Sequence, residues 1–127
     1  MVEYLSRLQN PNTLVNMAKI LKTDGTIVRN VKPQDGVSFS LEEMYAHVGN
    51  GCDMIEPVYL DGDCVMVCDE EGWLRDDAKI NILASAYLIM KTKDYREKHN
   101  LGMPSPIAGN VLICTTKEFE GEPENEL

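Results

Sequence analysis

The segment that most constrains the fold of this chain is residues 64–68, Cys-Val-Met-Val-Cys, which are apolar at every position. A strand that is apolar on both faces must be covered on both, so this segment predicts an interior strand of a sheet. Asp61 and Gly62 precede it, and an Asp-Gly pair is typical of a β-hairpin turn. The preceding residues 53–60 contain Pro57, which cannot donate a ladder hydrogen bond and therefore indicates an edge strand.

A second hairpin is predicted nearer the N-terminus. Asp24 and Gly25 form another Asp-Gly pair, between an apolar segment at residues 18–22 and the alternating segment 26–31. The C-terminal apolar run, residues 107–114, predicts one further strand. The chain therefore has about five strands, most of them paired through local turns.

The first of two predicted helices covers residues 41–47. Ser40 can cap its N-terminus, and Glu43 lies three residues further on, which is the capping-box spacing. Gly49 follows the helix and can adopt the left-handed conformation that ends one.

The second helix is predicted over residues 78–90, with Asp76 or Asp77 as its N-cap. It is apolar nearly all round apart from Asn81 and Ser85, which indicates a buried helix.

The predicted order of elements is ββαββαβ, and hairpins dominate it. This order is typical of an α+β domain, a small antiparallel or mixed sheet of about five strands with two helices on one face. With 127 residues the chain is expected to form one domain over residues 17–116, with an inserted polar loop at 91–106. Residues 1–16 are expected to be an N-terminal extension, and residues 117–127 an acidic, disordered tail.

The net charge of −9 is concentrated near the C-terminus, because the last ten residues contain five Glu and no base. An acidic chain is a poor partner for nucleic acid, so direct binding to it is not expected. No apolar run approaches the ~20 residues of a membrane-spanning helix, and no secretory signal is visible at the N-terminus. We expect a cytoplasmic protein that does not bind membranes.

No catalytic or metal-binding motif is recognisable. The four Cys and two His lack the paired spacings of a zinc site, and the thiols are expected to be buried apolar groups. The acidic residues from Asp61 onward fail the EF-hand pattern, because Met66 and Gly72 stand where that loop needs Gly and Glu. Neither a catalytic residue, a metal nor a cofactor is therefore predicted.

Two features are candidates for ligand binding. Asn81 lies on an apolar helix and either bonds to a neighbouring backbone or faces a pocket together with Trp73 and Arg75, near Glu71. The other feature is the basic part of the polar loop, which could grip an anion or could be a solvated loop. Its candidate residues are Tyr95, Arg96 and Lys98.

Five segments carry a resemblance to a known family: SLEEMYAHVGNG, IEPVYL, VCDEEGWL, NILA and IAGNVLI. Over residues 17–115 the chain resembles a domain-of-unknown-function family, number 3846, of phages, plasmids and conjugative elements. Residues 1–16, 91–106 and the Glu-rich tail depart from the family pattern. The residues that the resemblance marks are Gly49, Glu56, Glu70, Glu71, Gly72, Asn81 and Gly109.

The resemblance implies an accessory protein that a mobile element carries against host defences. We therefore expect a non-enzymatic protein that acts by binding. It would sequester an anionic nucleotide signal, held by Arg75, Arg96 and Lys98 with Trp73 or Tyr95 stacking on the base, or it would block a host defence protein.

Two other functions and a homo-oligomeric state are also compatible with the sequence. The acidic tail would suit a DNA-mimicking, antirestriction-type protein binder, and Glu71 with Asn81 would suit a small enzyme. An edge strand that pairs with a second copy would give a homo-oligomer.

Overall fold

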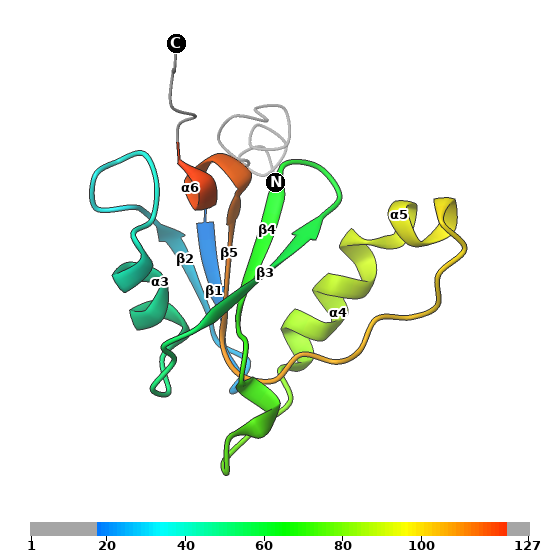
Figure 1. Cartoon of the computed structure of the whole chain (residues 1–127), viewed down its shortest axis with the longest axis horizontal. Coiled ribbons are helices and arrows are strands. Elements are labelled where there is room, and N and C mark those ends of the chain that lie inside the picture. Colours follow the sequence, from blue (N-terminus) through cyan, green and yellow to red (C-terminus); the bar gives the residue numbers. More distant parts are fainter. Residues whose placement is uncertain (1–17, 122–127) are drawn as a thin grey trace, which may run out of the picture.

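The computed structural model describes residues 18–121 and contains one five-stranded antiparallel sheet (Figure 1). The strand order across the sheet is β2-β1-β5-β4-β3. The strands are β1 (Ala18–Leu21), β2 (Ile27–Val31), β3 (Ile55–Leu60), β4 (Cys64–Asp69) and β5 (Val111–Thr115). Every pairing is antiparallel, so the α+β class and the antiparallel sheet are confirmed.

The interior strands are β1, β5 and β4. All five residues of β5 are buried, and Val65, Met66 and Val67 of β4 are inaccessible to solvent. The prediction of a covered strand at residues 64–68 is thus confirmed, and Pro57 lies on the edge strand β3 as predicted.

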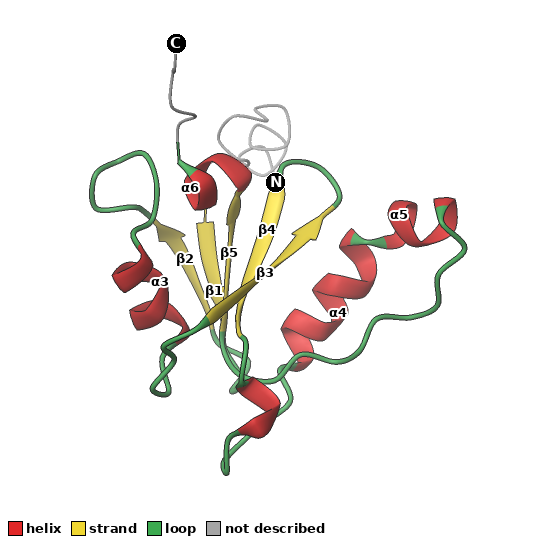
Figure 2. Cartoon of the chain, in the orientation of Figure 1, coloured by secondary structure: helices red, strands yellow, loops and turns green. Residues whose placement is uncertain are grey.

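The two main helices cover opposite faces of the sheet, so the prediction that both lie on one face was wrong (Figure 2). On one face, Met44 and Val48 of α3 (Leu41–Val48) pack in a core with Val65, Val67 and Leu112. On the other, α4 (Ile82–Lys91) packs against the intervening residues of the same strands. Its core contains Ala84, Leu88, Met66, Cys68, Val111 and Ile113. Successive strand residues point to opposite faces, so one strand supplies both cores.

Helix α3 begins as predicted. The hydroxyl of Ser40 accepts from the Glu43 N–H at 3.1 Å, and the Glu43 carboxylate accepts from the Ser40 N–H at 2.8 Å. Helix α4 begins later than predicted, and its N-cap is Asn81 rather than Asp76 or Asp77. The reason is a β-bridge between Ile80 and Ala108, which holds the chain in a non-helical conformation up to residue 80.

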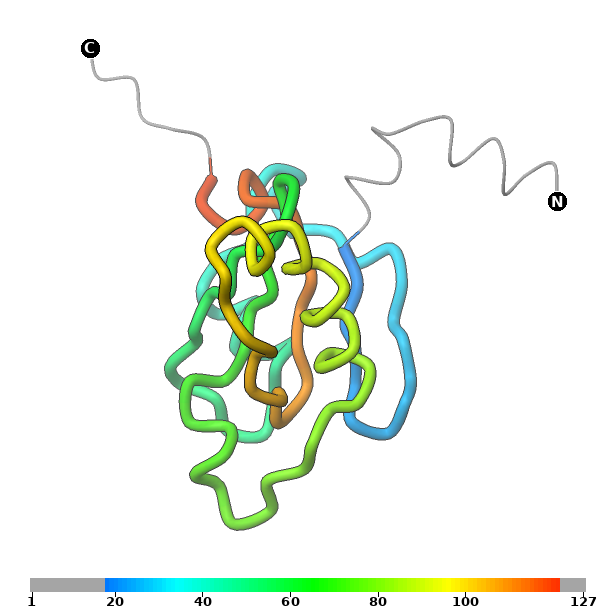
Figure 3. Tube along the Cα trace, turned by 90° about the vertical axis from the view of Figure 1, so that its right-hand side faces the viewer, coloured from blue at the N-terminus to red at the C-terminus, as the bar shows by residue number. Residues whose placement is uncertain are grey.

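Three further helical segments were not predicted. A 3₁₀ helix, η1 (Gly72–Leu74), follows β4. The polar segment 91–106 contains α5 (Lys93–Lys98), which lies beside the end of α4 (Figure 3). Helix α6 (Thr116–Glu120) occupies the start of the expected tail.

Helix α6 is anchored to the body of the domain. Glu118 is buried and forms a capping box with Thr115, and its carbonyl accepts from the Phe39 N–H at 2.8 Å. The predicted tail therefore begins too early at 117. The rest of that tail and the predicted extension 1–16 lie outside the described residues. No helix within residues 18–121 is long and apolar enough to span a membrane.

Candidate functional site

The chain reverses direction after β4, and an ion pair holds this reversal together. Asp69, the last residue of β4, has a nearly inaccessible side chain, and Arg75 follows η1. The Arg75 guanidinium donates from Nε to Oδ2 of Asp69 at 2.5 Å and from Nη2 to Oδ1 at 3.3 Å. Oδ1 also accepts from the Glu71 N–H at 3.0 Å. Arg75 is thereby committed to a structural contact.

The electrostatics of Asp69 follow from these contacts. Burial alone would raise the pKa of its carboxyl group, but the hydrogen bonds from Arg75 and from the Glu71 N–H outweigh that effect. The net result is a pKa below the usual value for Asp. The carboxylate is therefore a weak base and serves as the anchor of the turn.

Two large apolar side chains of η1 face solvent. Trp73 is 54% exposed and Leu74 is 80% exposed. The indole Nε1 of Trp73 donates to the Pro106 carbonyl at 3.0 Å, which fixes the ring against the loop that precedes β5. The carbonyl of Met54 accepts from the Glu70 N–H at 2.9 Å, which ties the residues before β3 to this turn. Exposed Trp held in one orientation is typical of a binding anchor.

Acidic side chains line two grooves beside these apolar groups. Trp73 and Leu74 share a groove of about 300 Å³ with Glu56 and Glu70. Leu74 also borders a second groove of about 410 Å³, with Glu71 and further acids among its lining residues. We call this patch the acidic-rimmed surface: Trp73 and Leu74 with Glu56, Glu70, Glu71, Asp76 and Asp77. All of these residues are exposed.

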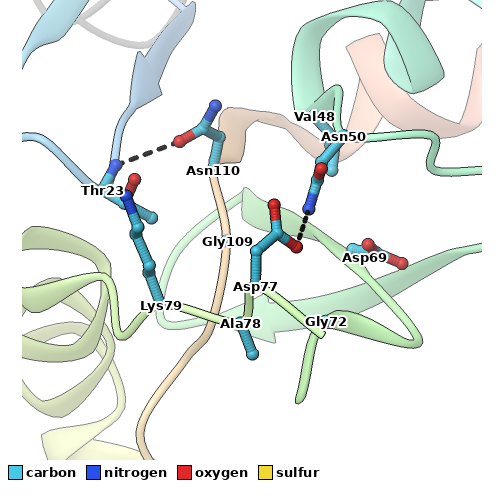
Figure 4. A pocket seen from close by; sticks show the side chains of 10 residues that line it. All are labelled: Thr23, Val48, Asn50, Asp69, Gly72, Asp77, Ala78, Lys79, Gly109 and Asn110. Atoms are coloured by element: carbon cyan, nitrogen blue, oxygen red, sulfur yellow. Dashed lines mark hydrogen bonds between the residues drawn. The ribbon is translucent and has the colours of Figure 1, made fainter. Parts of the chain in front are cut away.

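A small cleft adjoins this surface at the end of the sheet (Figure 4). Its lining includes Asp69, Asp77 and Gly109, and its volume is about 170 Å³. The Asn50 amide donates to Asp77 at 3.3 Å across one side of it. Pockets for drug-sized ligands usually occupy ~300–1,000 Å³, so this cleft is too small to hold such a ligand.

Asn81 has a structural role and is fully buried. Its Nδ2 donates to the carbonyls of Leu21 and Gly109, both at 2.9 Å, and its Oδ1 accepts from the Ala84 N–H at 2.9 Å. The amide thus joins β1, the start of β5 and α4. No hydrogen bond links it to Glu71, Trp73 or Arg75 in the described part of the chain, so the structure does not assemble that predicted pocket.

The predicted residues on α5 lie on a separate element. Arg96 is committed to α4, because its Nη2 donates to the Ile89 carbonyl at 2.7 Å and its Nε donates to the Thr92 hydroxyl at 3.0 Å. Tyr95 is exposed and packs against the ring of His99, with a centroid distance of 4.3 Å. Lys98 is exposed. Of the three cations predicted to hold a nucleotide, two are thus engaged in internal contacts.

The raised pKa values of the cysteine thiols disfavour a role as nucleophiles. Burial raises the pKa of Cys52 and Cys64, and it raises the pKa of Cys68 and Cys114 to about 12. Nucleophilic cysteines require the opposite shift. Among the described residues, no group of three or more His, Cys, Asp or Glu side chains could hold a metal ion.

Sequence reasoning identified Trp73 and Glu71 of this surface but missed Leu74. A signal was present in the sequence: the acidic run 69–71 and Gly72 are followed by Trp73 and Leu74, an apolar pair outside every predicted strand and helix.

The sheet with a helix on each face defines a small α+β domain with one acidic, partly apolar pole. The chain belongs to the family described as a domain of unknown function (DUF3846), whose model matches residues 18–125. That description names no activity. Comparison with curated proteins and with solved structures finds no significant match.

Proposed function

We propose that this protein acts by binding a partner protein through the acidic-rimmed surface, as a non-enzymatic accessory protein of a phage or another mobile element. The observation that carries the proposal is the exposure of Leu74 and Trp73, at 80% and 54%, in two grooves that are also lined by carboxylates. An apolar centre with a polar rim is the usual anatomy of a protein interface. The role in counter-defence rests on the family resemblance.

The negative charge of this surface indicates the chemistry of the partner that it would bind. The rim contains five exposed carboxylates, and Arg75, which lines one of the two grooves, is already paired with Asp69. Complementary charge favours a partner with an apolar pocket surrounded by Lys and Arg. A nucleic-acid-binding host protein has such a surface, which also suits the DNA-mimicking alternative.

Binding is favoured over catalysis by the state of the titratable groups. Burial suppresses the thiolates, and hydrogen bonds from neighbouring groups lower the pKa of Asp69, as they do for Asp24, Asp35 and Glu43. Catalytic bases need a pKa tuned toward the working pH. An enzyme based on Glu71 and Asn81 is disfavoured, because the amide of Asn81 is already used in three hydrogen bonds.

The proposal is tested with the full-length protein as bait in a lysate of the host, followed by titration calorimetry with the purified partner. Replacing Trp73 and Leu74 together by Ser should weaken binding at least about 30-fold, since anchor side chains contribute ~2 kcal/mol or more. The matched control is Leu101→Ser, which removes an exposed Leu outside the surface.

The acidic rim gives a second readout. Glu70→Lys should slow association and reduce its dependence on salt, because rim charges act mainly on the encounter rate. A partner that binds the Trp73/Leu74 double variant as tightly as the unaltered protein would contradict the proposal.

A further inference from the structure

A second cavity lies at a different place in the fold, between α4 and the sheet. Its volume is about 400 Å³, which is within the range for small-molecule sites. Lys19 of β1, Cys64 of β4, Ile113 of β5 and Tyr87 and Lys91 of α4 line it, together with Asp61 and Asp63 of the turn between β3 and β4. Four elements that are distant in the sequence thus meet around one space.

Two ammonium groups converge on one aromatic ring in this cavity. The Nζ of Lys19 lies 5.0 Å from the centroid of the Tyr87 ring, and the Nζ of Lys91 lies 6.0 Å from the same centroid. Tyr87 and Lys91 are four residues apart in a helix and therefore share a face. The ring holds both cations near the cavity.

Lys19 shares this cavity with two acidic residues but forms no ion pair with either of them among the described residues. Within residues 18–121, no carboxylate lies within ion-pair distance of its ammonium group. Its pKa is lowered by partial burial and by the neighbouring charges of Arg29 and Lys91. Like charges gathered in a partly desolvated site oppose folding unless an anion joins them.

The C-terminus of α4 would ordinarily repel an anion, because its free carbonyls are electronegative. Here those carbonyls accept hydrogen bonds from outside the helix. Leu88 accepts from the Thr92 hydroxyl at 2.7 Å, Ile89 from Arg96 at 2.7 Å and Lys91 from the Asp61 N–H at 2.7 Å. These hydrogen bonds therefore reduce the negative electrostatic potential that the carbonyls create beside Lys91.

From these observations we propose that the cavity binds a small phosphate monoester, with the phosphate between the ammonium groups of Lys19 and Lys91. A phosphate dianion can pair with both ammonium groups at once, and neither Asp61 nor Asp63, which also line the cavity, forms an ion pair with Lys19 or Lys91 within residues 18–121. Ile113 and Thr115 also line the cavity and would contact the body of the ligand. The site is independent of the acidic-rimmed surface.

The test is calorimetry with inorganic phosphate, ribose 5-phosphate and adenosine 5′-monophosphate as probes. Lys19→Gln and Lys91→Gln should each weaken binding at least about 10-fold, the value of one charge-assisted hydrogen bond. Lys98→Gln, which makes the same charge change on exposed α5, should leave it unchanged. Tighter binding of the two esters than of phosphate would support a monoester, whereas equal affinity for all three would overturn that part and leave a free-phosphate site.

Thermal unfolding supplies a readout that does not depend on the choice of probe. Without added anion, Lys19→Gln should raise Tm, because it removes a cation that is partly buried and repelled. Phosphate at a fixed ionic strength should raise Tm of the unaltered protein and of Lys98→Gln, but not of Lys19→Gln. The proposal fails if none of the probes binds at millimolar concentration, or if Lys19→Gln and Lys98→Gln respond alike.

Discussion

Arg75 holds both carboxylate oxygens of Asp69, with its Nε at 2.5 Å from Oδ2 and its Nη2 at 3.3 Å from Oδ1. The same guanidinium donates to the Gly51 carbonyl at 3.4 Å. One side chain thereby ties the end of β4 to the loop after α3. The exposed η1 residues project from a turn that this ion pair keeps rigid, which is an advantage for a binding surface.

The Asp69–Arg75 pair should make stability depend on acid. The folded-state pKa of Asp69 lies below its unfolded value of ~3.9, so the stabilisation is present above that pH and is lost as pH falls through the folded pKa. Arg75→Gln should therefore lower the free energy of unfolding at pH 7 and have a smaller effect on it near pH 3. Urea titrations of both proteins across this range measure the difference, and an effect of equal size at pH 3 would contradict it.

Asn81→Ala should be among the most destabilising single changes. It removes an N-cap and leaves the carbonyls of Leu21 and Gly109 without their donor, for a loss of about 3 kcal/mol in the free energy of unfolding. Asn81→Ser keeps a capping oxygen and should recover about 1 kcal/mol of this loss. Urea unfolding measures both. A loss below about 1 kcal/mol for Asn81→Ala would contradict the bridging role.

Gly72→Ala should be destabilising because of a close backbone approach. A Cβ at this position would lie 2.8 Å from the carbonyl oxygen of Ala108. That oxygen belongs to the backbone, which cannot easily move away. Overpacking of this kind costs about 1–3 kcal/mol. Gly102→Ala is the matched control, since nothing lies within 4 Å of its Cβ, and it should leave Tm nearly unchanged. Equal Tm values for the two variants would show that the turn relaxes.

The thiols should react slowly in the folded protein. With the pKa of Cys68 and Cys114 at about 12, only about one molecule in 10⁴ carries either thiolate at pH 8. Cys64 is partly exposed and should react first with a disulfide reagent, followed by slow labelling limited by opening of the fold. All four should react rapidly in denaturant. Fast labelling of Cys68 in the folded state would contradict its burial.

The locally encoded features of this fold were predictable. The Asp-Gly turns, the Ser40–Glu43 capping box and the doubly covered strand at 64–68 depend on residues close together in the chain, and the structure contains all of them. Helix α5 was missed because its residues are charged without an apolar stripe, so the usual periodic signal is absent. The start of α4 was misplaced because a pairing between distant residues, Ile80 and Ala108, decides it.

The candidate sites were only partly predictable, for the same reason. Trp73 and Glu71 could be singled out from their neighbours in the chain. The pairing of Arg75 with Asp69 and of Arg96 with the end of α4, which removes two predicted ligand contacts, depends on how the chain turns in space. The cavity around Tyr87 was not foreseen, because Lys19 and Lys91 meet only when β1 and α4 pack together.

Residue patterns alone therefore established an α+β domain with hairpins and a capped helix, since turn chemistry and periodicity act over a few residues. They could not determine which face of the sheet each helix covers, because one strand, apolar on both sides, is compatible with either arrangement. Tertiary packing placed α3 and α4 on opposite faces, made Asn81 the link between β1 and α4, and left Trp73 and Leu74 exposed. These outcomes depend on long-range contacts, whose energies no local window of sequence contains.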